Sequence, residues 1–569
     1  MIISLFNMAL ALAVIFLVGY GSTALIGKLL HIPSIDIDLK IVIGFVMTTI
    51  YAECYSLFAG VANAALLIII LISAIIYFAN RAKINSELKG FFGRLSGWML
   101  LVTLLFGIVF VVISGDVPKA WDDYLYHAAA IRWIEEYGVV PGLANIQHRF
   151  AYNSSFMCFQ ALFSFSGIAA FEHRSFHSMN ALASFLLCSY CVCTMSFIKT
   201  KKIVGSDLLK LAALFYVAVY FAEISSAGTD YITLYMVAYV FIKAFEYCEK
   251  EIVDAGFYGL LAVIGIFSCT LKLSAGLIVL IVFLPLIAYI REKEYKEIMV
   301  FAIFSMLIVI PFLIRNVIIC GYLLYPFRGL DLFNVDWKLP MATVDIDSVS
   351  MRWIAKSLGP AGYGLEGADT AHIWEWLPYW FRTSLSFMDQ IIFVACIVGI
   401  FIYAIIFIRR LCHRELKRMD FFMVCFIAQF IFWLVVCPLP RYGYMYMLML
   451  MSMAASYMQH NARAVYGTIV VLFLATITYK AVSTYDAKEV RFLVPADYVK
   501  GEDVEGHQTS LKDKYGNEVV FYTHAGDHSR TYYQWFPMLD NGEYDSFDNL
   551  IFRGEYIKDG FATKLLERE

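Results

Sequence analysis

The chain has 569 residues, of which 61% are hydrophobic and only 16% are charged, and its formal net charge is −3. A soluble chain would carry roughly a quarter charged residues, so this composition excludes an ordinary soluble globular protein. The small net charge gives no indication of nucleic-acid binding.

Apolar stretches recur along the whole chain, and each is about twenty residues long, enough to cross a bilayer as a helix. Runs of this kind indicate helices, because the strands of a membrane barrel alternate in hydrophobicity. They predict an all-α polytopic membrane protein with about 14 transmembrane helices. The first stretch lacks a basic leader and is predicted to be a retained span. The predicted spans are roughly 2–20, 40–59, 61–79, 97–114, 178–198, 208–223, 231–247, 256–271, 275–290, 297–314, 386–408, 420–436, 442–458 and 465–482.

Basic residues predict how these spans are oriented. Lys and Arg cluster in the segments after the third, fifth, ninth and eleventh spans, and an alternating count puts all four clusters on one side. An excess of basic residues marks the cytoplasmic side. The membrane domain, residues 1–482, is therefore predicted to have outer loops over 115–177 and 315–385. The region 483–569 is expected on the same outer side, as is the N-terminus.

The C-terminal region differs in pattern from the membrane domain. Short β-like runs, such as residues 518–522, alternate with turn residues such as Asp540, Asn541 and Gly542. Strands bounded by turn residues are typical of small folded units. The region is predicted to be a small extracytoplasmic α/β appendage.

The first outer loop begins with two acidic residues directly after a span. Asp122 and Asp123 would open a helix over residues 121–137, which is expected to be amphipathic and to lie along the membrane surface. Carboxylates in a first turn can be simple helix caps. However, a spacing of four puts Asp122 beside Tyr126 and Asp123 beside His127. A carboxylate held in this way can act as a general base, so both acids are candidate catalytic residues.

Further ionisable residues lie at the outer ends of later spans. Asp230 begins the seventh span, Lys272 lies in the turn between the eighth and ninth, Arg315 ends the tenth, and Arg441 follows Pro440 in a turn. Taken singly, Asp230 could be a cap and Lys272 a snorkelling side chain. Taken together, they bring carboxylates and cations to one membrane face. This combination predicts transfer of a group from a phosphate-linked lipid, with Asp230 as a third catalytic candidate and the cations binding phosphate.

The remaining candidates are polar and aromatic residues near these span ends. The predicted substrate-binding residues are His127, Tyr126, Arg149, Asn153, Lys272, Arg315, Asn316, Tyr325 and Arg441.

A family resemblance rests on several of these motifs. Trp121-Asp122-x-x-x-Tyr126-His127, Arg132-Trp133-Ile134 and Gln147-x-Arg149 resemble the first outer loop of bacterial proteins related to dolichyl-phosphate-mannose-protein mannosyltransferases. Those enzymes are C-type (GT-C) membrane glycosyltransferases. Residues 272–274, 315–316, 321–326 and 440–442 resemble further motifs of an uncharacterised bacterial branch. In this chain three spans precede the span of the acidic loop, whereas familiar members place that loop after their first span.

The resemblance implies an inverting glycosyltransferase with a GT-C-like fold in the bacterial inner membrane. Its donor would be a polyprenyl-phosphate sugar, and its acceptor a glycan, lipid or protein on the extracytoplasmic face, in cell-surface polysaccharide synthesis. The acidic motif would fall on Asp122, with Asp123, and the acid of the second loop on Asp230. Some relatives need a divalent metal, Mg²⁺ or Mn²⁺, and others do not.

Three alternative readings stay open from the sequence. A polysaccharide polymerase or ligase that uses a lipid-diphosphate oligosaccharide would need similar chemistry. A lipid-linked sugar transporter or flippase is the rival from another class, although transporters are expected to show repeats and polar groups near the midplane. An inactive scaffold relative is the third reading.

Overall fold

The computed structural model describes residues 2–168, 177–197, 203–457, 506–512, 518–524, 533, 536–537 and 549–564. Within these ranges, helical structure covers each predicted span from 2–20 to 442–458, whereas the predicted span 465–482 lies outside the described residues. The α-helices are α1 (Ile2–Leu29), α2 (Ile37–Ser56), α3 (Asn63–Gly93), α4 (Gly97–Ile113), α5 (Ala128–Tyr137), α6 (Ser155–Leu162), α7 (Met179–Thr194), α9 (Gly205–Val219), α10 (Thr229–Glu249), α11 (Ala255–Leu271), α12 (Phe283–Glu292), α13 (Tyr295–Cys320), α14 (Met341–Ala355), α15 (Gly367–Thr370), α16 (Ile373–Thr383), α17 (Phe387–His413), α18 (Arg418–Val436) and α19 (Pro440–Tyr457).

Several of these helices have the length and composition of membrane spans. Among the described residues, six are long and apolar enough to cross a bilayer, namely Ile2–Leu29, Asn63–Gly93, Leu273–Glu292, Tyr295–Cys320, Phe387–His413 and Arg418–Val436. Shorter apolar helices cover Gly97–Ile113, Met179–Thr194 and Ala255–Leu271. Many of their large apolar side chains are exposed, as expected where hydrocarbon replaces water as the solvent. The chain is a helical membrane protein.

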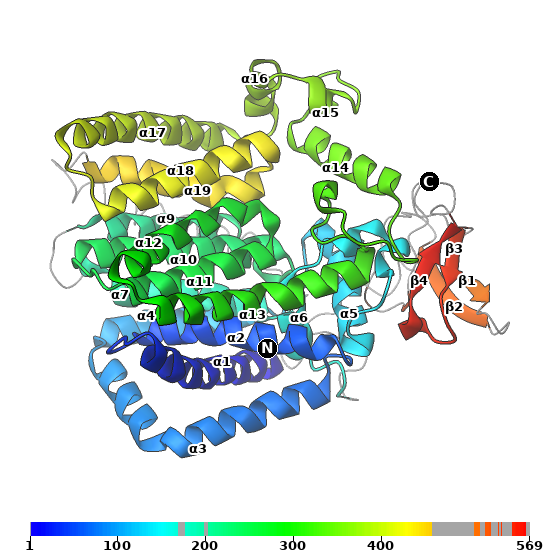
Figure 1. Ribbon diagram of the computed structural model, residues 1–569, viewed down its shortest axis with the longest axis horizontal. Helices are drawn as coiled ribbons and strands as arrows, with labels where there is room; N and C mark the ends of the chain where they lie inside the picture. The colour runs from blue at the N-terminus through cyan, green and yellow to red at the C-terminus, as the bar shows by residue number, and fades with distance from the viewer. Residues whose placement is uncertain are drawn as a thin grey trace.

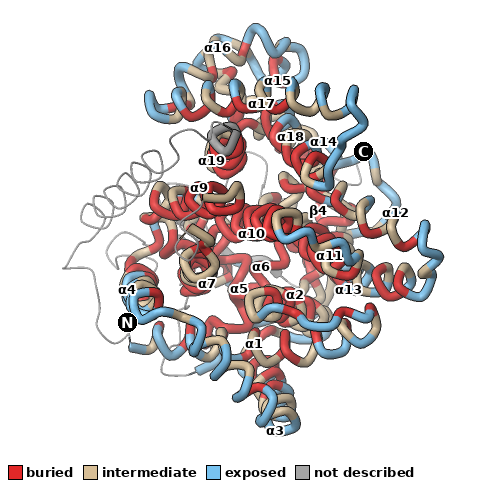
Figure 2. The backbone as a smooth tube through the Cα atoms, turned by 90° about the vertical axis from the view of Figure 1, so that its left-hand side faces the viewer, coloured by how far each residue is buried: buried red, intermediate tan, exposed pale blue. Residues whose placement is uncertain are grey.

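Helix α10 forms the centre of the bundle. All but its last two residues are buried, including Lys243 and Glu246. It packs against α7, α9, α11 and α18, and Figure 2 shows it in the interior of the molecule. A helix that is covered on every side forms the core on which the others are arranged. The start of α10, which carries Asp230, is therefore held in place by several neighbouring elements.

Helices α1 and α2 cross in very close contact. A Cβ atom added at Gly19 would overlap with the carbonyl oxygen of Lys40, and one added at Gly44 would overlap with that of Ile15. Small residues at such a crossing let two backbones approach and gain packing contacts in a membrane. These two glycines explain why α1 and α2 form a tight pair (Figure 1).

The segment between α4 and α7 is buried under other protein. Most residues of α5 are buried, and its apolar face packs against α6. The expectation that lipid covers the apolar face of this helix is wrong, because protein side chains cover that face. Figure 1 places α5 at one end of the bundle, beside α6, while α14 to α16 extend beyond the helices at the same end.

The described part of the C-terminal region contains two small antiparallel sheets. Strand β1 (Gly506–Lys512) pairs with β2 (Glu518–His524), and β3 (Leu550–Phe552) pairs with β4 (Phe561–Thr563). The sheet part of the predicted appendage is thus present. It lies beside α5 (Figure 1), and the Phe561 N–H donates to the carbonyl of Pro141 at 2.9 Å. The C-terminal region therefore packs on the 115–177 segment.

Candidate functional site

Asp122 and Asp123 lie at the start of an unusual turn. After α4 ends, the chain enters a π-helical turn over Asp123–His127 that runs directly into α5. A π turn is wider than an α turn and is frequent at functional sites. The two neighbouring carboxylates point into different environments at this turn. Asp123 is fully buried, whereas the Asp122 side chain is 18% exposed.

Two groups contact the Asp123 carboxylate. Its Oδ1 lies 3.0 Å from Nδ1 of His127, and its Oδ2 accepts the N–H of Ala227 at 2.9 Å. Burial raises the pKa of Asp123, and the hydrogen bonds from His127 and Ala227 offset part of that rise. Asp123 thus connects the segment after α4 to the loop before α10.

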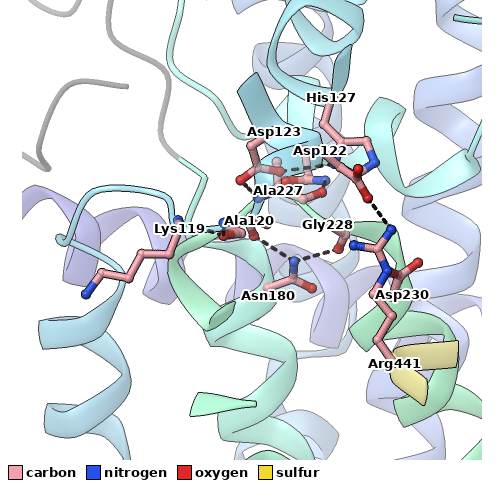
Figure 3. Close-up of polar contacts among 12 residues, drawn as sticks. Lys119, Ala120, Asp122, Asp123, His127, Asn180, Ala227, Gly228, Asp230 and Arg441 are labelled. Carbon is pink, nitrogen blue, oxygen red and sulfur yellow. Dashed lines mark hydrogen bonds and ion pairs between the residues drawn. The ribbon is translucent and has the colours of Figure 1, made fainter. Parts of the chain in front are cut away.

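The loop over residues 225–228 is held from several sides. The Ser226 hydroxyl accepts the backbone N–H groups of Lys119 and Ala120, at 3.1 and 3.0 Å. The Asn180 amide donates to the carbonyls of Ser226 and Gly228, at 2.7 and 2.8 Å. These contacts, most of them drawn in Figure 3, fix the start of α10 relative to the segment that carries Asp122.

Two cations meet the carboxylates at this point. Nη2 of Arg441 lies 2.6 Å from Oδ2 of Asp122, and Nε lies 3.3 Å from Oδ2 of Asp230. Lys272 forms an ion pair with Oδ1 of Asp230, and its Nζ lies 3.6 Å from the ring centre of Tyr442. Figure 3 shows Arg441 reaching from α19 to Asp122, with Asp230 beside it. Four residues from four separate parts of the chain therefore form one cluster, which we call the rim cluster.

Local structure explains how each cation is presented. Lys272 has an extended backbone between the end of α11 and a 3₁₀ segment over Leu273–Val282, so its side chain leaves the helix direction. Arg441 follows Pro440, which begins α19, a position that suits proline because it has no N–H to satisfy. The Lys272 and Arg441 side chains are 22% and 33% exposed. The rim cluster is thus open on the side of these cations and Asp122.

The other predicted binding residues lie around the rim cluster or beyond it. The Tyr126 ring lies 4.3 Å from that of His127 and 6.5 Å from that of Tyr152. Arg149 is half-buried, and no ion pair joins it to any residue that the structure describes. Tyr325 donates its hydroxyl to Asp347 at 2.7 Å. Among the described residues, no ion pair joins Tyr126, Arg149 or Tyr325 to the rim cluster.

Arg315 lies in a separate buried cluster. It is 1% exposed and donates to the Ser56 hydroxyl at 2.5 Å and to the Asn153 amide oxygen at 3.3 Å. Asn153 in turn donates to Asn316 at 3.0 Å. The structure therefore brings Asn153, Arg315 and Asn316 together, but not at the carboxylates that Lys272 and Arg441 contact.

One buried acidic residue, Asp347, was missed by the sequence analysis, because no motif singles it out. Asp347 of α14 accepts hydrogen bonds from the hydroxyls of Tyr152 and Tyr325, at 2.5 and 2.7 Å, and its Oδ1 lies 3.3 Å from Nε2 of His148. Burial raises the pKa of Asp347, but His148 and the two tyrosines outweigh that effect and lower it overall. Asn180, which secures the 225–228 loop, was missed as well. A buried Asn within an apolar stretch is the one signal that could have identified it.

The residues present do not fit a divalent metal at the rim cluster. Among the described residues, no three His, Cys, Asp or Glu side chains gather as a metal would require. Arg441 already contacts both Asp122 and Asp230, so its guanidinium occupies the space between the two carboxylates that Mg²⁺ or Mn²⁺ would need.

The fold and the rim cluster define a helical membrane protein with an ion-paired site where the Asp122 loop meets the helix ends. Residues 1–448 match the model of a family described as a domain of unknown function (DUF8201), and the chain belongs to this family. No curated protein and no solved structure matches the chain.

Proposed function

We propose that the protein is a C-type membrane glycosyltransferase that moves a sugar from a polyprenyl-phosphate donor to an acceptor glycan, lipid or protein. The observation that supports this most is the meeting of Asp122, Asp230, Lys272 and Arg441 in one partly exposed cluster. Carboxylates can accept a proton, and cations can bind a phosphate, so both halves of a transfer reaction are present.

The proposed reaction uses the open side of the cluster. The donor phosphate accepts hydrogen bonds from Arg441 and Lys272, and this weakens the ion pair between Arg441 and Asp122. Asp122 then accepts the proton of the acceptor hydroxyl as its oxygen attacks the anomeric carbon. The bond between that carbon and the phosphate oxygen breaks, and the polyprenyl phosphate leaves with the electron pair. Cations beside the departing phosphate stabilise the charge that develops on it.

Asp123, His127 and Asp230 have positioning roles in this scheme. Asp123 is too buried to contact an acceptor and instead holds the π turn through His127 and Ala227. Asp230 orients both cations from the start of α10. These roles are assigned from the exposure of each carboxylate, since only Asp122 is accessible enough to contact an acceptor.

The membrane arrangement is part of the proposal. About 14 spans with a GT-C-like fold would place the rim cluster on the extracytoplasmic face of the bacterial inner membrane. The loop segments that hold the cluster and the C-terminal region would share that face. Lipid-borne donors would then reach the cations from the bilayer, in the service of cell-surface polysaccharide synthesis.

The test uses the purified full-length protein in lipid nanodiscs. Polyprenyl phosphate binding is measured for the wild type, Asp122→Asn, Lys272→Gln and Arg441→Gln, with Arg409→Gln as a surface control. Loss of one charge-assisted contact costs about 1.5–3 kcal/mol, so each cation variant should bind at least about tenfold more weakly. Asp122→Asn should bind normally but lose sugar transfer when incubated with a panel of polyprenyl-phosphate sugars.

The outcomes separate the competing functions. Release of polyprenyl monophosphate with a glycosylated acceptor supports the transferase, and release of diphosphate indicates a polymerase or ligase. Movement of an intact lipid-linked sugar between leaflets, without bond cleavage, indicates a flippase. Equal binding of polyprenyl phosphate by the wild type and both cation variants would refute the phosphate site.

A further inference from the structure

A large apolar cavity lies within the helix bundle, apart from the rim cluster. Its volume is about 740 Å³, and residues of α1, α2, α3, α4, α7 and α10 line it. Nearly all of the lining is hydrocarbon, with Leu12, Phe45, Leu104 and Leu186 as examples. None of Asp122, Asp230, Lys272 and Arg441 lines this space.

The cavity is elongated. Its lining follows α7 from Met179 to Thr194, a distance of about 22 Å at 1.5 Å per residue. Met179 is next to Asn180, whose side chain turns instead toward the 225–228 loop. The other end reaches Asp38, which accepts a hydrogen bond from Tyr239 at 2.8 Å and pairs with Lys243 at 2.8 Å. The cavity thus runs from behind the rim cluster to the opposite end of the bundle.

The cavity also communicates with the surface that faces lipid. Leu100 and Leu104 of α4 line it and are 40% and 62% exposed, and Phe92 of α3 lines it and is 54% exposed. Figure 1 shows α3 running outside α1 and then curving around the end of the bundle. An opening between α3 and α4 therefore leads from the bilayer into the cavity.

Physical chemistry selects a hydrocarbon chain as the occupant. Water would find few hydrogen-bond partners in so apolar a space. If the space stayed empty, the side chains that line it would lose dispersion contacts. Bilayer lipid can enter through the lateral opening and restore those contacts.

Positive charge near this opening favours a lipid with an anionic headgroup. Four exposed basic residues lie in the last turns of α3 or just after it, namely Arg81, Lys83, Lys89 and Arg94. Leu88, next to Lys89, and Leu95, next to Arg94, line the cavity. Basic residues near a membrane surface attract anionic lipids. We propose that this cavity binds one acyl chain of an anionic glycerophospholipid, whose phosphate lies beside Lys89 and Arg94. The site requires only that these helices lie in a bilayer and is independent of the proposed transfer reaction.

The test is native mass spectrometry of the full chain after delipidation, titrated with phosphatidylglycerol, phosphatidylcholine or polyprenyl phosphate. The wild type should retain one phosphatidylglycerol. Ala183→Phe places a ring in the cavity and should weaken binding at least about tenfold, whereas Ala64→Phe, on an exposed face outside the cavity, should not. The pair Lys89→Gln and Arg94→Gln should weaken phosphatidylglycerol about fivefold per charge and leave phosphatidylcholine unchanged.

A matched control removes two exposed basic residues elsewhere, Arg409 and Arg414, by the same change to Gln. Equal weakening by this control would show that binding is a general surface effect and would overturn the site. A preference for polyprenyl phosphate over phosphatidylglycerol would overturn the assignment of the ligand. If Ala183→Phe fails to fold, the charge variants decide, and unchanged phosphatidylglycerol affinity in them refutes the proposal.

Discussion

Two adjacent aspartates in this chain have different physical environments, and that difference assigns their roles. Asp122 is partly exposed and pairs with Arg441, whereas Asp123 is fully buried and pairs with His127 and the Ala227 N–H. An exposed ion pair contributes little to stability, but a buried acceptor that satisfies two donors contributes more. Asp122 is therefore accessible to a substrate, whereas Asp123 has a structural role.

This contrast predicts that the two aspartates contribute unequally to stability. Asp123→Ala leaves His127 and the Ala227 N–H without their acceptor and should destabilise the protein by about 1–3 kcal/mol. Asp122→Ala removes a partly exposed pair and should cost about 0–1 kcal/mol. Thermal unfolding of both purified variants, followed by intrinsic fluorescence, checks this. Equal losses would show that the two carboxylates are not divided in this way.

Glu135 predicts a pH dependence of stability. It is buried in α5 and accepts the Tyr533 hydroxyl at 2.7 Å. Burial raises the pKa of Glu135 to about 7, against 4.5 for an ordinary Glu, and the Tyr533 hydrogen bond offsets only part of this. The folded protein therefore keeps a proton that the unfolded chain releases near pH 4.5. Its contribution, about 3 kcal/mol, is complete below that pH and is lost as the pH rises through about 7.

Thermal unfolding between pH 5 and pH 8 measures this effect. Glu135→Gln stays neutral, so its unfolding temperature should fall less over this range than that of the wild type. Glu136→Gln, at the exposed neighbouring position, should retain the wild-type slope. Identical slopes for Glu135→Gln and the wild type would contradict the assignment.

Among the elements, close contacts between backbones decide the arrangement as much as hydrophobicity does. The pairing of α1 with α2 depends on Gly19 and Gly44, where no side chain fits. The start of α10 depends on hydrogen bonds from Asn180 and Asp123 to the loop before it. Both features place helices accurately without adding any apolar surface.

The α1–α2 crossing gives a direct test. Gly44→Ala puts a methyl group into the backbone of α1 at Ile15 and should destabilise the protein by about 1–3 kcal/mol. Gly90→Ala in α3 meets nothing within 4 Å and should be neutral or stabilising by up to about 1 kcal/mol, because Ala favours helix over Gly. Unfolding in detergent compares the two. A neutral Gly44→Ala would mean that the helices can separate without cost.

At the scale of the whole molecule, two groups of ion pairs lie toward opposite ends of the bundle. The rim cluster lies where the segment that carries Asp122 meets α10, α11 and α19. A second set of ion pairs lies toward the other end of α10, where buried Lys210 pairs with buried Glu246, and buried Lys243 pairs with the more exposed Asp36 and Asp38. Each buried charge of this set has an oppositely charged partner, which limits its desolvation cost.

Membrane topology is testable with few changes to the chain. Cys412 is exposed, and the other eleven cysteines are buried or half-buried, so a Cys412→Ala background is expected to react slowly. A cysteine at position 555 should react with an impermeant reagent in intact cells, and one at position 292 should react only after permeabilisation. The reverse pattern would invert the orientation and place the rim cluster on the cytoplasmic side.

The sequence alone was sufficient for the class of protein and the position of most helices. Apolar runs about twenty residues long must satisfy their backbone groups internally, so the helices over 2–20, 297–314 and 386–408 follow from composition. From their positions at span ends, the sequence predicted that Lys272, Arg315 and Arg441 gather with the carboxylates on one face. Lys272 and Arg441 do meet Asp122 and Asp230, but the inclusion of Arg315 was wrong.

Tertiary structure decided how those residues are partnered. Periodicity predicts which face of a helix is apolar, but it does not say whether lipid or protein covers that face, and α5 was misassigned for this reason. Likewise, span ends at one depth can lie anywhere around the bundle. Arg315 therefore pairs with Asn153 and Ser56, whereas Arg441 reaches Asp122, 319 residues away in the chain. Contacts between distant segments depend on packing between helices, and a single sequence carries no local signal for them.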